Sequence, residues 1–150
     1  MIVQMNASHV SEVAEMEKLC FSDPWSERSI ASELDNELSL WLVSELDGKV
    51  VGYIGSQSVP PESDVMNVAV LPQYRKQGIA QALIAELVHR LRSDGMESLT
   101  LEVRASNAPA ICLYTKLGFE TVGRRPRYYV NPKEDALIMR KELSDADIIR

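Results

Sequence analysis

The chain has 150 residues, which suits one domain that buries about two thirds of its unfolded surface. Its 45% hydrophobic and 25% charged residues are typical of a soluble globular protein, and neither a membrane span nor a signal-peptide pattern stands out, so we expect a cytoplasmic protein. The formal net charge of -6 disfavours direct binding of nucleic acid, which depends on Lys and Arg.

The N-terminal half predicts two helices followed by strands. Ser8 and Ser26 can each cap a helix, because a serine hydroxyl accepts a hydrogen bond from a free backbone N–H of the first turn. Asp47-Gly48 lies between two β-rich runs and is a strong hairpin signal. The predicted elements are a strand at 2–5, helices at 8–20 and 26–34, and strands at 38–46, 50–59 and 65–71.

The C-terminal half predicts a long helix, a strand, a second helix and the last strands. Apolar residues recur at helical spacing from Gln77 to Arg92, whereas apolar and polar residues alternate over 99–103. Asn107 is a good helix cap, and Gly118 suits the exit from that helix. The predicted elements are helices at 77–92 and 107–117 and strands at 99–103, 119–122, 128–130 and 136–139.

The predicted order of elements is β-α-α-β-β-β-α-β-α-β-β, which indicates an α/β (α+β) fold with a mixed sheet and helices on both faces. No repeat, low-complexity tract or linker stands out, so we expect one domain over residues 1–143. Residues 144–150 are expected to form a frayed tail. Element order by itself assigns no function.

Charge is unevenly distributed along the chain. Between residues 12 and 37, eight acids stand against two bases, so this one segment accounts for the whole net charge. A basic run, Arg124, Arg125 and Arg127, lies near the other end. A solvated face is the usual explanation of such runs, and recruitment of a basic substrate is the alternative for the acids.

The chain's two cysteines predict neither a metal site nor a redox centre. Cys20 and Cys112 lack the spacing of either, so we expect buried free thiols. Cys112 has no His nearby in sequence, which favours a packing role over a nucleophile. His9 and His89 are far apart and have no Cys or His neighbours, so we expect no metal.

The stretch from Arg75 to Gln81 lies between an apolar run and the long helix. Gly78 lets a ligand approach the backbone closely, and Ala80 keeps that approach open. The free N–H groups of a helix's first turn attract an anion such as a pyrophosphate. Neither the dinucleotide nor the P-loop glycine motif is present. Taken alone, the stretch is explained equally well as a simple junction of loop and helix.

Two further stretches, LEVRASN at 101–107 and LYTKLGF at 113–119, complete a family pattern. With R-x-x-G-x-A at 75–80 they resemble the GNAT family of N-acetyltransferases. Within it, 101–107, the Phe21 to Ser26 segment and Tyr128-Tyr129 resemble the RimI-type branch, whose members acetylate the N-terminal alanine of a small-subunit ribosomal protein. The resemblance extends over nearly the whole chain, about residues 1–143.

The resemblance implies acetyl-CoA as cosubstrate and a role for individual residues. Glu102 matches the branch's general base and Tyr114 its general acid, while Tyr128 and Tyr129 match positions that grip the substrate. Pro126 departs from the pattern and leaves the shape of this substrate loop open. The positions that match coenzyme contacts are Val68, Ala69, Val70, Lys76, Gln77, Gly78, Ile79, Ala80, Gln81 and Asn107.

The chemistry suits these residue types. An N-terminal amine has a pKa of about 8 and must lose a proton before it attacks a thioester, and a carboxylate can take that proton. A phenol can protonate the departing thiolate. Glu102 could instead be a solvent-facing strand residue and Tyr114 a core aromatic. The alternative functions are acetylation of a small amine, such as a polyamine or amino sugar, and a non-catalytic module that binds acetyl-CoA.

The default oligomeric state is a monomer.

Overall fold

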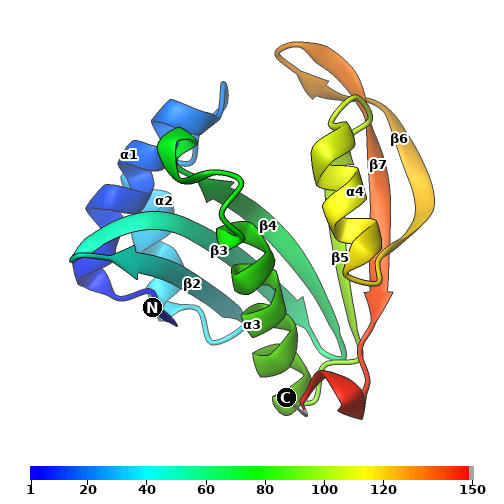
Figure 1. The fold of residues 1–150 in the computed structure, drawn as a ribbon, viewed down its shortest axis with the longest axis horizontal. Coiled ribbons are helices and arrows are strands. Elements are labelled where there is room, and N and C mark those ends of the chain that lie inside the picture. Colours follow the sequence, from blue (N-terminus) through cyan, green and yellow to red (C-terminus); the bar gives the residue numbers. More distant parts are fainter. Residues whose placement is uncertain (149–150) are drawn as a thin grey trace.

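The computed structural model describes residues 1–148, which form a seven-stranded mixed sheet with helices on both faces (Figure 1). The strand order is β1-β2-β3-β4-β5-β7-β6. This architecture confirms the predicted fold class and element order. The strands are β1 (Ile2–Gln4), β2 (Ser39–Leu46), β3 (Lys49–Val59), β4 (Glu62–Val70), β5 (Ser98–Arg104), β6 (Glu120–Val130) and β7 (Lys133–Glu142), and the α-helices are α1 (Val10–Cys20), α2 (Glu27–Ser32), α3 (Ile79–Ser93) and α4 (Ala108–Lys116).

Side-chain caps fix where the first two helices begin. The Asn6 side chain accepts a hydrogen bond from the Ser8 backbone N–H at 2.9 Å and starts a short 3-10 turn ahead of α1. The predicted cap at Ser8 is therefore wrong by two residues, because Asn6 supplies the acceptor. Ser26 accepts a hydrogen bond from the Ser29 N–H at 3.0 Å and caps α2, as predicted.

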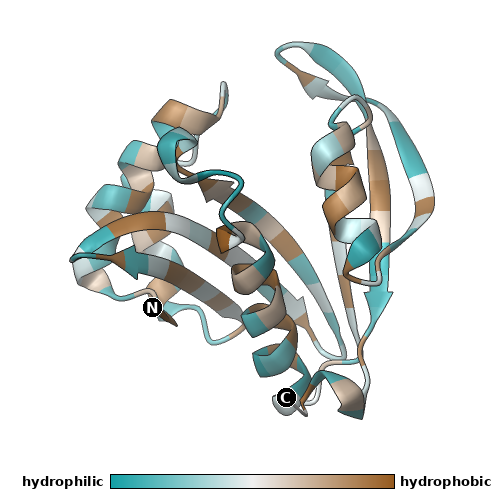
Figure 2. Ribbon diagram, in the orientation of Figure 1, coloured by the Kyte–Doolittle hydropathy of each residue, from teal (hydrophilic) through white to brown (hydrophobic). Residues whose placement is uncertain are grey.

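Two apolar cores lie on opposite faces of the sheet. Helix α3 contributes Leu83 and Leu87 to one core, which also holds Tyr114 of α4. Helices α1 and α2 cover the other core, where the Trp41 ring stacks on Tyr53 with centroids 6.1 Å apart. Figure 2 shows apolar segments on the strands and on the helices that cover them. Burying a large apolar side chain stabilises the fold by roughly 1.5–3 kcal/mol, so both cores hold helices to the sheet.

The sheet opens between β4 and β5. These strands pair in parallel from Glu62 with Ser98 to Asp64 with Thr100. Within residues 1–148 the pairing stops there, although β4 continues to Val70 and β5 to Arg104. The two strands part from that point, as the ribbon shows (Figure 1). The sheet is thus split into two wings joined near one end, and we call the space between them the V.

The last two strands form a long antiparallel hairpin. The segments predicted at 119–122 and 128–130 are one strand, β6, whose register with β7 shifts between Arg125 and Tyr129. Pro126 lies in this irregular stretch of an edge strand, where a missing N–H costs no ladder hydrogen bond. The proline therefore interrupts the pairing without ending the strand.

The cysteines, the C-terminal segment and the lengths of the helices test three further expectations. Cys112 is exposed and Cys20 is half-buried, so the expectation of buried thiols is wrong for Cys112, although both thiols are free. The predicted tail contains a 3-10 turn, Asp145–Asp147, whose Asp147 carboxylate lies 3.6 Å from Lys141 Nζ. The rest of that prediction, at 149–150, lies outside the described residues. None of the helices in residues 1–148 is long and apolar enough to cross a membrane.

Candidate functional site

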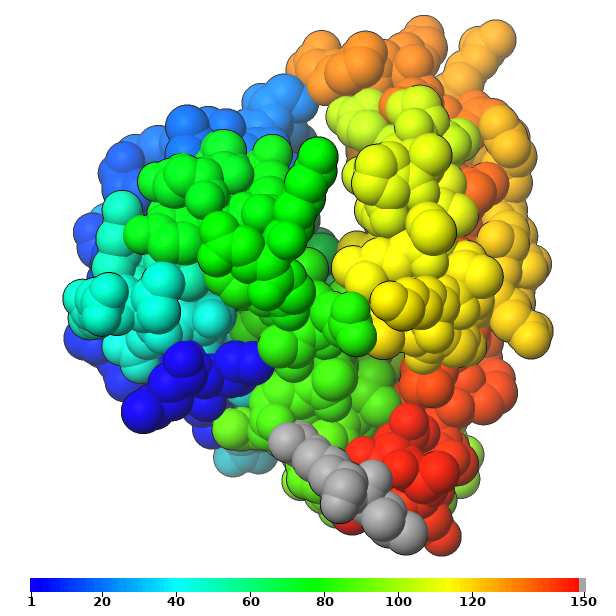
Figure 3. Space-filling model, in the orientation of Figure 1, coloured from blue at the N-terminus to red at the C-terminus, as the bar shows by residue number. Residues whose placement is uncertain are grey.

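Gly78 begins α3 at the mouth of the V. It adopts a left-handed conformation with a φ of 83°, and a side chain added there would meet no atom within 4 Å, so the backbone is open to a ligand. The N–H groups of the following turn have no acceptor within the helix, which makes this end attractive to anions. Figure 3 shows the surface hollowed between this green segment and α4, in yellow. The predicted residues Lys76, Gln77, Gly78, Ile79, Ala80 and Gln81 all lie at this junction.

Arg75 ties this junction to the end of β4. Its Nε donates a hydrogen bond to the Val70 carbonyl at 3.0 Å. A second contact runs from its Nη2 to the Cys20 sulfur at 3.8 Å. The sequence pattern includes Arg75 but gave no reason for it, because one partner is a backbone oxygen and the other lies 55 residues away. The contact with Val70 fixes the loop before α3 relative to the strand that forms one wall of the V.

Strand β4 presents an unpaired edge to the V. Val68, Ala69 and Val70 pair with β3 on one side, at Ile54, Tyr53 and Gly52 respectively. Pairing with β5 has already ended at Asp64, so among residues 1–148 no strand covers the other side. Backbone N–H and C=O groups are obligatory hydrogen-bonding groups, and an extended ligand chain can supply their partners.

Glu102 lies on β5, on the opposite wall. Its neighbours Leu101 and Val103 point into the α3–α4 core, so Glu102 faces the other side of the sheet. Its Oε1 lies 3.4 Å from Arg125 Nε. Its Oε2 is buried and has no hydrogen-bond partner among residues 1–148. A buried acceptor without a partner is rare in proteins and indicates a water, a ligand or a catalytic role.

Tyr128 and Tyr129 of β6 gather around Glu102. Their rings meet edge to face with centroids 5.1 Å apart. Contact with the Glu102 carboxylate raises the pKa of the Tyr128 phenol above its ordinary value. Burial, followed by the charge of Glu102, raises the pKa of Tyr129 to about 12. The register shift in β6 thus brings both tyrosines to the predicted base.

Tyr114 lies on α4 and is 7% exposed. Its ring packs edge to face on Phe119 with centroids 5.8 Å apart. Tyr114 is therefore a core aromatic, which is the alternative to a catalytic role that the sequence left open. Burial raises its pKa to about 12, with Tyr129 as the second cause. No residue among 1–148 hydrogen-bonds its hydroxyl. The phenol is protonated at neutral pH and has a proton to give.

Asn107 caps α4, as predicted, by accepting a hydrogen bond from the Ala110 N–H at 3.2 Å. Its Oδ1 is therefore engaged in the helix itself. The amide nitrogen is the part of this side chain that a coenzyme contact would use. The cap places Asn107 at the end of α4 that follows β5.

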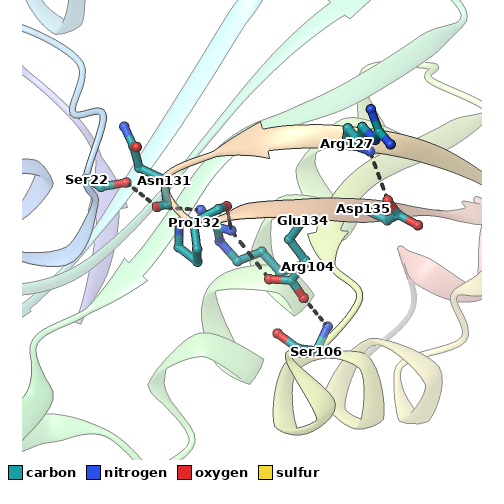
Figure 4. Close-up of polar contacts among 8 residues, drawn as sticks. All are labelled: Ser22, Arg104, Ser106, Arg127, Asn131, Pro132, Glu134 and Asp135. Atoms are coloured by element: carbon teal, nitrogen blue, oxygen red, sulfur yellow. Dashed lines mark hydrogen bonds and ion pairs between the residues drawn. The ribbon is translucent and has the colours of Figure 1, made fainter.

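A polar cluster holds the turn between β6 and β7 (Figure 4). Arg104 donates from Nη1 to the Pro132 carbonyl at 2.9 Å and from Nη2 to the Asn131 carbonyl at 3.1 Å. The Asn131 carbonyl also accepts from the Ser22 hydroxyl at 2.9 Å. The sequence signals for this cluster were the LEVRASN stretch, which contains Arg104, and the Phe21 to Ser26 segment, which contains Ser22, but neither indicated a role in holding the turn.

The sequence falls within a known family pattern. The sequence model of the Acetyltransferase (GNAT) family matches residues 10–119. The chain is similar to the [ribosomal protein bS18]-alanine N-acetyltransferase of Escherichia coli, with 37% identity over 131 residues that cover 86% of this chain and 88% of that protein. The Haemophilus influenzae protein of the same name is 32% identical over 142 residues, covering 92% of this chain and 95% of that protein.

The backbone is also similar to solved structures. The crystal structure of the Escherichia coli ribosomal-protein-alanine N-acetyltransferase matches with a TM-score of 0.88 and 36% identity, covering 96% of this chain and 94% of that one. Ard1 from Thermoplasma volcanium has the same fold, with a TM-score of 0.88 at 24% identity and coverage of 97% and 98%.

Proposed function

Because the chain belongs to the Acetyltransferase (GNAT) family and is an acyltransferase, we propose that it transfers acetyl from acetyl-CoA to the N-terminal α-amine of a protein. The proposed substrate is the N-terminal alanine of a small-subunit ribosomal protein, which would be met in the cytoplasm. The similar proteins of Escherichia coli and Haemophilus influenzae are named for this activity. The observation that carries the proposal is the partnerless Oε2 of Glu102 beside the two hairpin tyrosines.

The coenzyme is assigned to the V and the start of α3. The open backbone at Gly78 and the free N–H groups after it suit a pyrophosphate, and Asn107 lies across the hollow on α4. No strand among residues 1–148 covers this side of β4 at Val68, Ala69 and Val70. Apart from the Val70 carbonyl, which accepts from Arg75, the edge suits an extended amide chain, which is the chemistry of a pantetheine arm. When bound, acetyl-CoA supplies the acetyl group already activated as a thioester.

Glu102 is proposed to take the proton from the incoming amine. Its Oε2 has no hydrogen bond to lose, whereas Oε1 is steadied by Arg125 at 3.4 Å. A carboxylate can remove the proton directly or through one water, which leaves the amine its lone pair. Backbone N–H groups along the free edge of β4 are proposed to stabilise negative charge on the carbonyl oxygen that the amine attacks.

Tyr114 is proposed to return a proton to the leaving sulfur. With a pKa of about 12 its phenol holds its proton at neutral pH, and its hydroxyl is not used by any residue among 1–148. Transfer is direct from thioester to amine, so no acyl-enzyme forms. The exposed Cys112 on the same helix has no part in this scheme.

The hairpin is proposed to hold the peptide. Tyr128 is 49% exposed and Val130 is 74% exposed at the end of β6, so this surface offers apolar and phenolic groups to a peptide chain. A polyamine or an amino sugar does not need an apolar and phenolic surface of this kind for binding. A peptide substrate therefore accounts for more of the structure than a small amine does.

Incubation with acetyl-CoA and a panel of acceptors tests the proposal. The panel contains peptides that begin with alanine, the same peptides with a blocked N-terminus, polyamines and amino sugars, and products are read by mass. Acetylation confined to free peptide N-termini supports the proposed function. Acetylation of the small amines alone contradicts it, and binding of acetyl-CoA without any transfer would identify a non-catalytic module.

A further inference from the structure

We propose that Arg104 is a positioning residue, which fixes the β6–β7 hairpin over the acceptor side of the V and so sets peptide affinity. The inference rests on the proposed function for its kinetic consequences, because it assumes that the hairpin holds the peptide. Its structural half, the fixing of the hairpin by one guanidinium, can be tested without any substrate.

The turn of the hairpin is held by both terminal nitrogens of one guanidinium. Arg104 Nη1 and Nη2 donate to the carbonyls of Pro132 and Asn131, at 2.9 and 3.1 Å. The same group lies over the Tyr129 ring, with Cζ 4.2 Å from the ring centroid. Arg104 comes from β5, two residues after Glu102 on the same face. One side chain of β5 therefore links the wall that carries Glu102 to the hairpin turn and to the Tyr129 ring.

Glu134 extends this cluster toward α4. Its Oε1 lies 3.4 Å from Arg104 Nη1, and its Oε2 accepts from the Ser106 N–H at 2.6 Å (Figure 4). Hydrogen bonding from Ser106 lowers the pKa of Glu134, as expected for a carboxylate held in its charged form. Ser106 directly precedes Asn107, the cap of α4. The hairpin turn and the loop before α4 are therefore fixed to one another through two charged side chains.

Ser22 connects the same turn to the opposite wing. Its hydroxyl donates to the Asn131 carbonyl at 2.9 Å, the same oxygen that Arg104 Nη2 contacts. Ser22 belongs to the connection between α1 and α2, 109 residues away in sequence. The two wings, paired at one end through β4 and β5, are thus bridged again at the hairpin tip.

The contact requires an arginine. The planar guanidinium donates hydrogen bonds to the two carbonyls and stacks on the Tyr129 ring at the same time. A lysine ammonium has no plane that could stack, and its side chain differs in length. Arg104→Lys should therefore keep the charge near Glu134 and lose most of the positioning. Arg104→Met keeps the length of the side chain and removes every polar contact.

Kinetics separate positioning from a general effect on the fold. In Arg104→Met we expect the KM for an alanine peptide to rise about tenfold or more, as for loss of charge-assisted hydrogen bonds, with a smaller fall in kcat. Calorimetric Kd for acetyl-CoA should stay within about twofold, because the start of α3 is unchanged. Arg104→Lys should lie between wild type and Arg104→Met. The matched control is Arg92→Met, which removes an arginine that also bridges a carboxylate and a carbonyl, Asp145 at 3.1 Å and Met96 at 3.3 Å, on α3.

Amide hydrogen exchange tests the structural half directly. Exchange over residues 128–134 should accelerate about tenfold in Arg104→Met, and stay at the wild-type rate in Arg92→Met, with the core strands β2 and β3 unchanged in both. Unchanged exchange in the hairpin together with an unchanged peptide KM would overturn the inference. If the wild-type protein acetylates no peptide, the proposed function fails while faster exchange still supports the role of Arg104 in fixing the hairpin.

Discussion

The Arg125 guanidinium lies 3.4 Å from one oxygen of Glu102, while the other oxygen is buried and has no hydrogen-bond partner among residues 1–148. The two halves of one carboxylate therefore have different surroundings. The arginine, 56% exposed, comes from the irregular stretch of β6. This asymmetry is one reason why Glu102 is the proposed base.

Glu102→Gln should lower kcat by about 10²- to 10⁴-fold at neutral pH, because an amide keeps the shape of the carboxylate but takes no proton. The Kd for acetyl-CoA, measured by calorimetry, should change little. Turnover close to wild type across the pH range would show that Glu102 is only a structural residue of β5, and another base would have to be found.

Gly78→Glu should abolish measurable acetyl-CoA binding in calorimetry, because it adds a negative side chain at the open backbone where phosphate is assigned. Gly95→Glu is the matched control at the other end of α3. Gly95 also has a positive φ, 89°, and open space around it, so both variants carry the same backbone strain. Wild-type affinity in a folded Gly78→Glu protein would remove this site from the scheme.

Tyr114→Phe should slow turnover with little change in peptide KM, because it removes only the hydroxyl. Since the pKa of Tyr114 is raised to about 12, the phenol stays protonated throughout the neutral range, and the effect should be constant between about pH 6 and 9. Steady-state rates must be paired with a single-turnover measurement, so that slow product release does not hide the effect. An unchanged single-turnover rate would show that Tyr114 only packs in the core and is not the general acid.

The acids next to the hairpin tip should steer basic peptides. Asp23 and Glu27 are exposed and follow Ser22, whereas the exposed Asp35 and Glu37 lie on the α2–β2 connection, away from the tip (Figure 1). Reversing the charge of the first pair to Lys should lower kcat/KM for a basic peptide several-fold at low salt and leave a neutral peptide unaffected. The second pair, reversed in the same way, is the control. Equal responses of the two peptides would leave these acids a role in solubility only.

The buried carboxylate of Glu17 should make stability depend on pH. It accepts hydrogen bonds from the Trp25 N–H at 2.8 Å, the Asn67 amide at 2.8 Å and the Tyr53 hydroxyl, yet burial raises its pKa above the ordinary 4.5. The folded state therefore binds this proton more tightly than the unfolded state. The free energy of unfolding should fall as the pH rises from the unfolded pKa through the folded one.

Urea unfolding of Glu17→Gln against wild type over about pH 4 to 8 checks this expectation. The variant cannot ionise, so the stability difference between the two proteins should change with pH in that direction. Glu17→Ala should cost about 3 kcal/mol or more, because it leaves buried donors without acceptors. A stability difference that is constant with pH would contradict the raised pKa.

Local signals explain which parts of the fold could be predicted. The hairpin at Asp47-Gly48 was predictable because both residues adopt positive φ, 52° and 76°, which favours Asp and Gly. The cap at Asn107 and the apolar stripe of α3 are likewise decided by residues close in sequence. The register shift of β6 depends on how Pro126 and its neighbours pair with β7, and this pairing cannot be inferred from the strand alone.

Contacts between residues far apart in the chain explain which features could not be predicted from the sequence. The acidic run from residue 12 to 37 looked like a solvated face, and this interpretation is wrong for Glu17 and Glu33, which are buried. Glu17 meets Tyr53 and Asn67, 36 and 50 residues away, and Glu33 meets Gln57, 24 residues away. The proposed role of Arg104 was equally hidden, because two of its partners are backbone carbonyls, which every residue has, and Tyr129 and Glu134 lie 25 and 30 residues away. The roles of the candidate site residues remain predictions for the experiments above.

The packing of Trp25 on Trp41, with centroids 5.4 Å apart, gives the protein its own optical reporter. These are the two tryptophans of the chain. Trp41 is buried, whereas Trp25 is half-buried on the connection between α1 and α2 that also carries Ser22. Indole emission shifts with the polarity around the ring, and Trp25 is the ring whose surroundings change if that connection moves. Fluorescence titration of the unlabelled protein with peptide therefore reports, at a single excitation wavelength, whether the surroundings of Trp25 change when the acceptor binds.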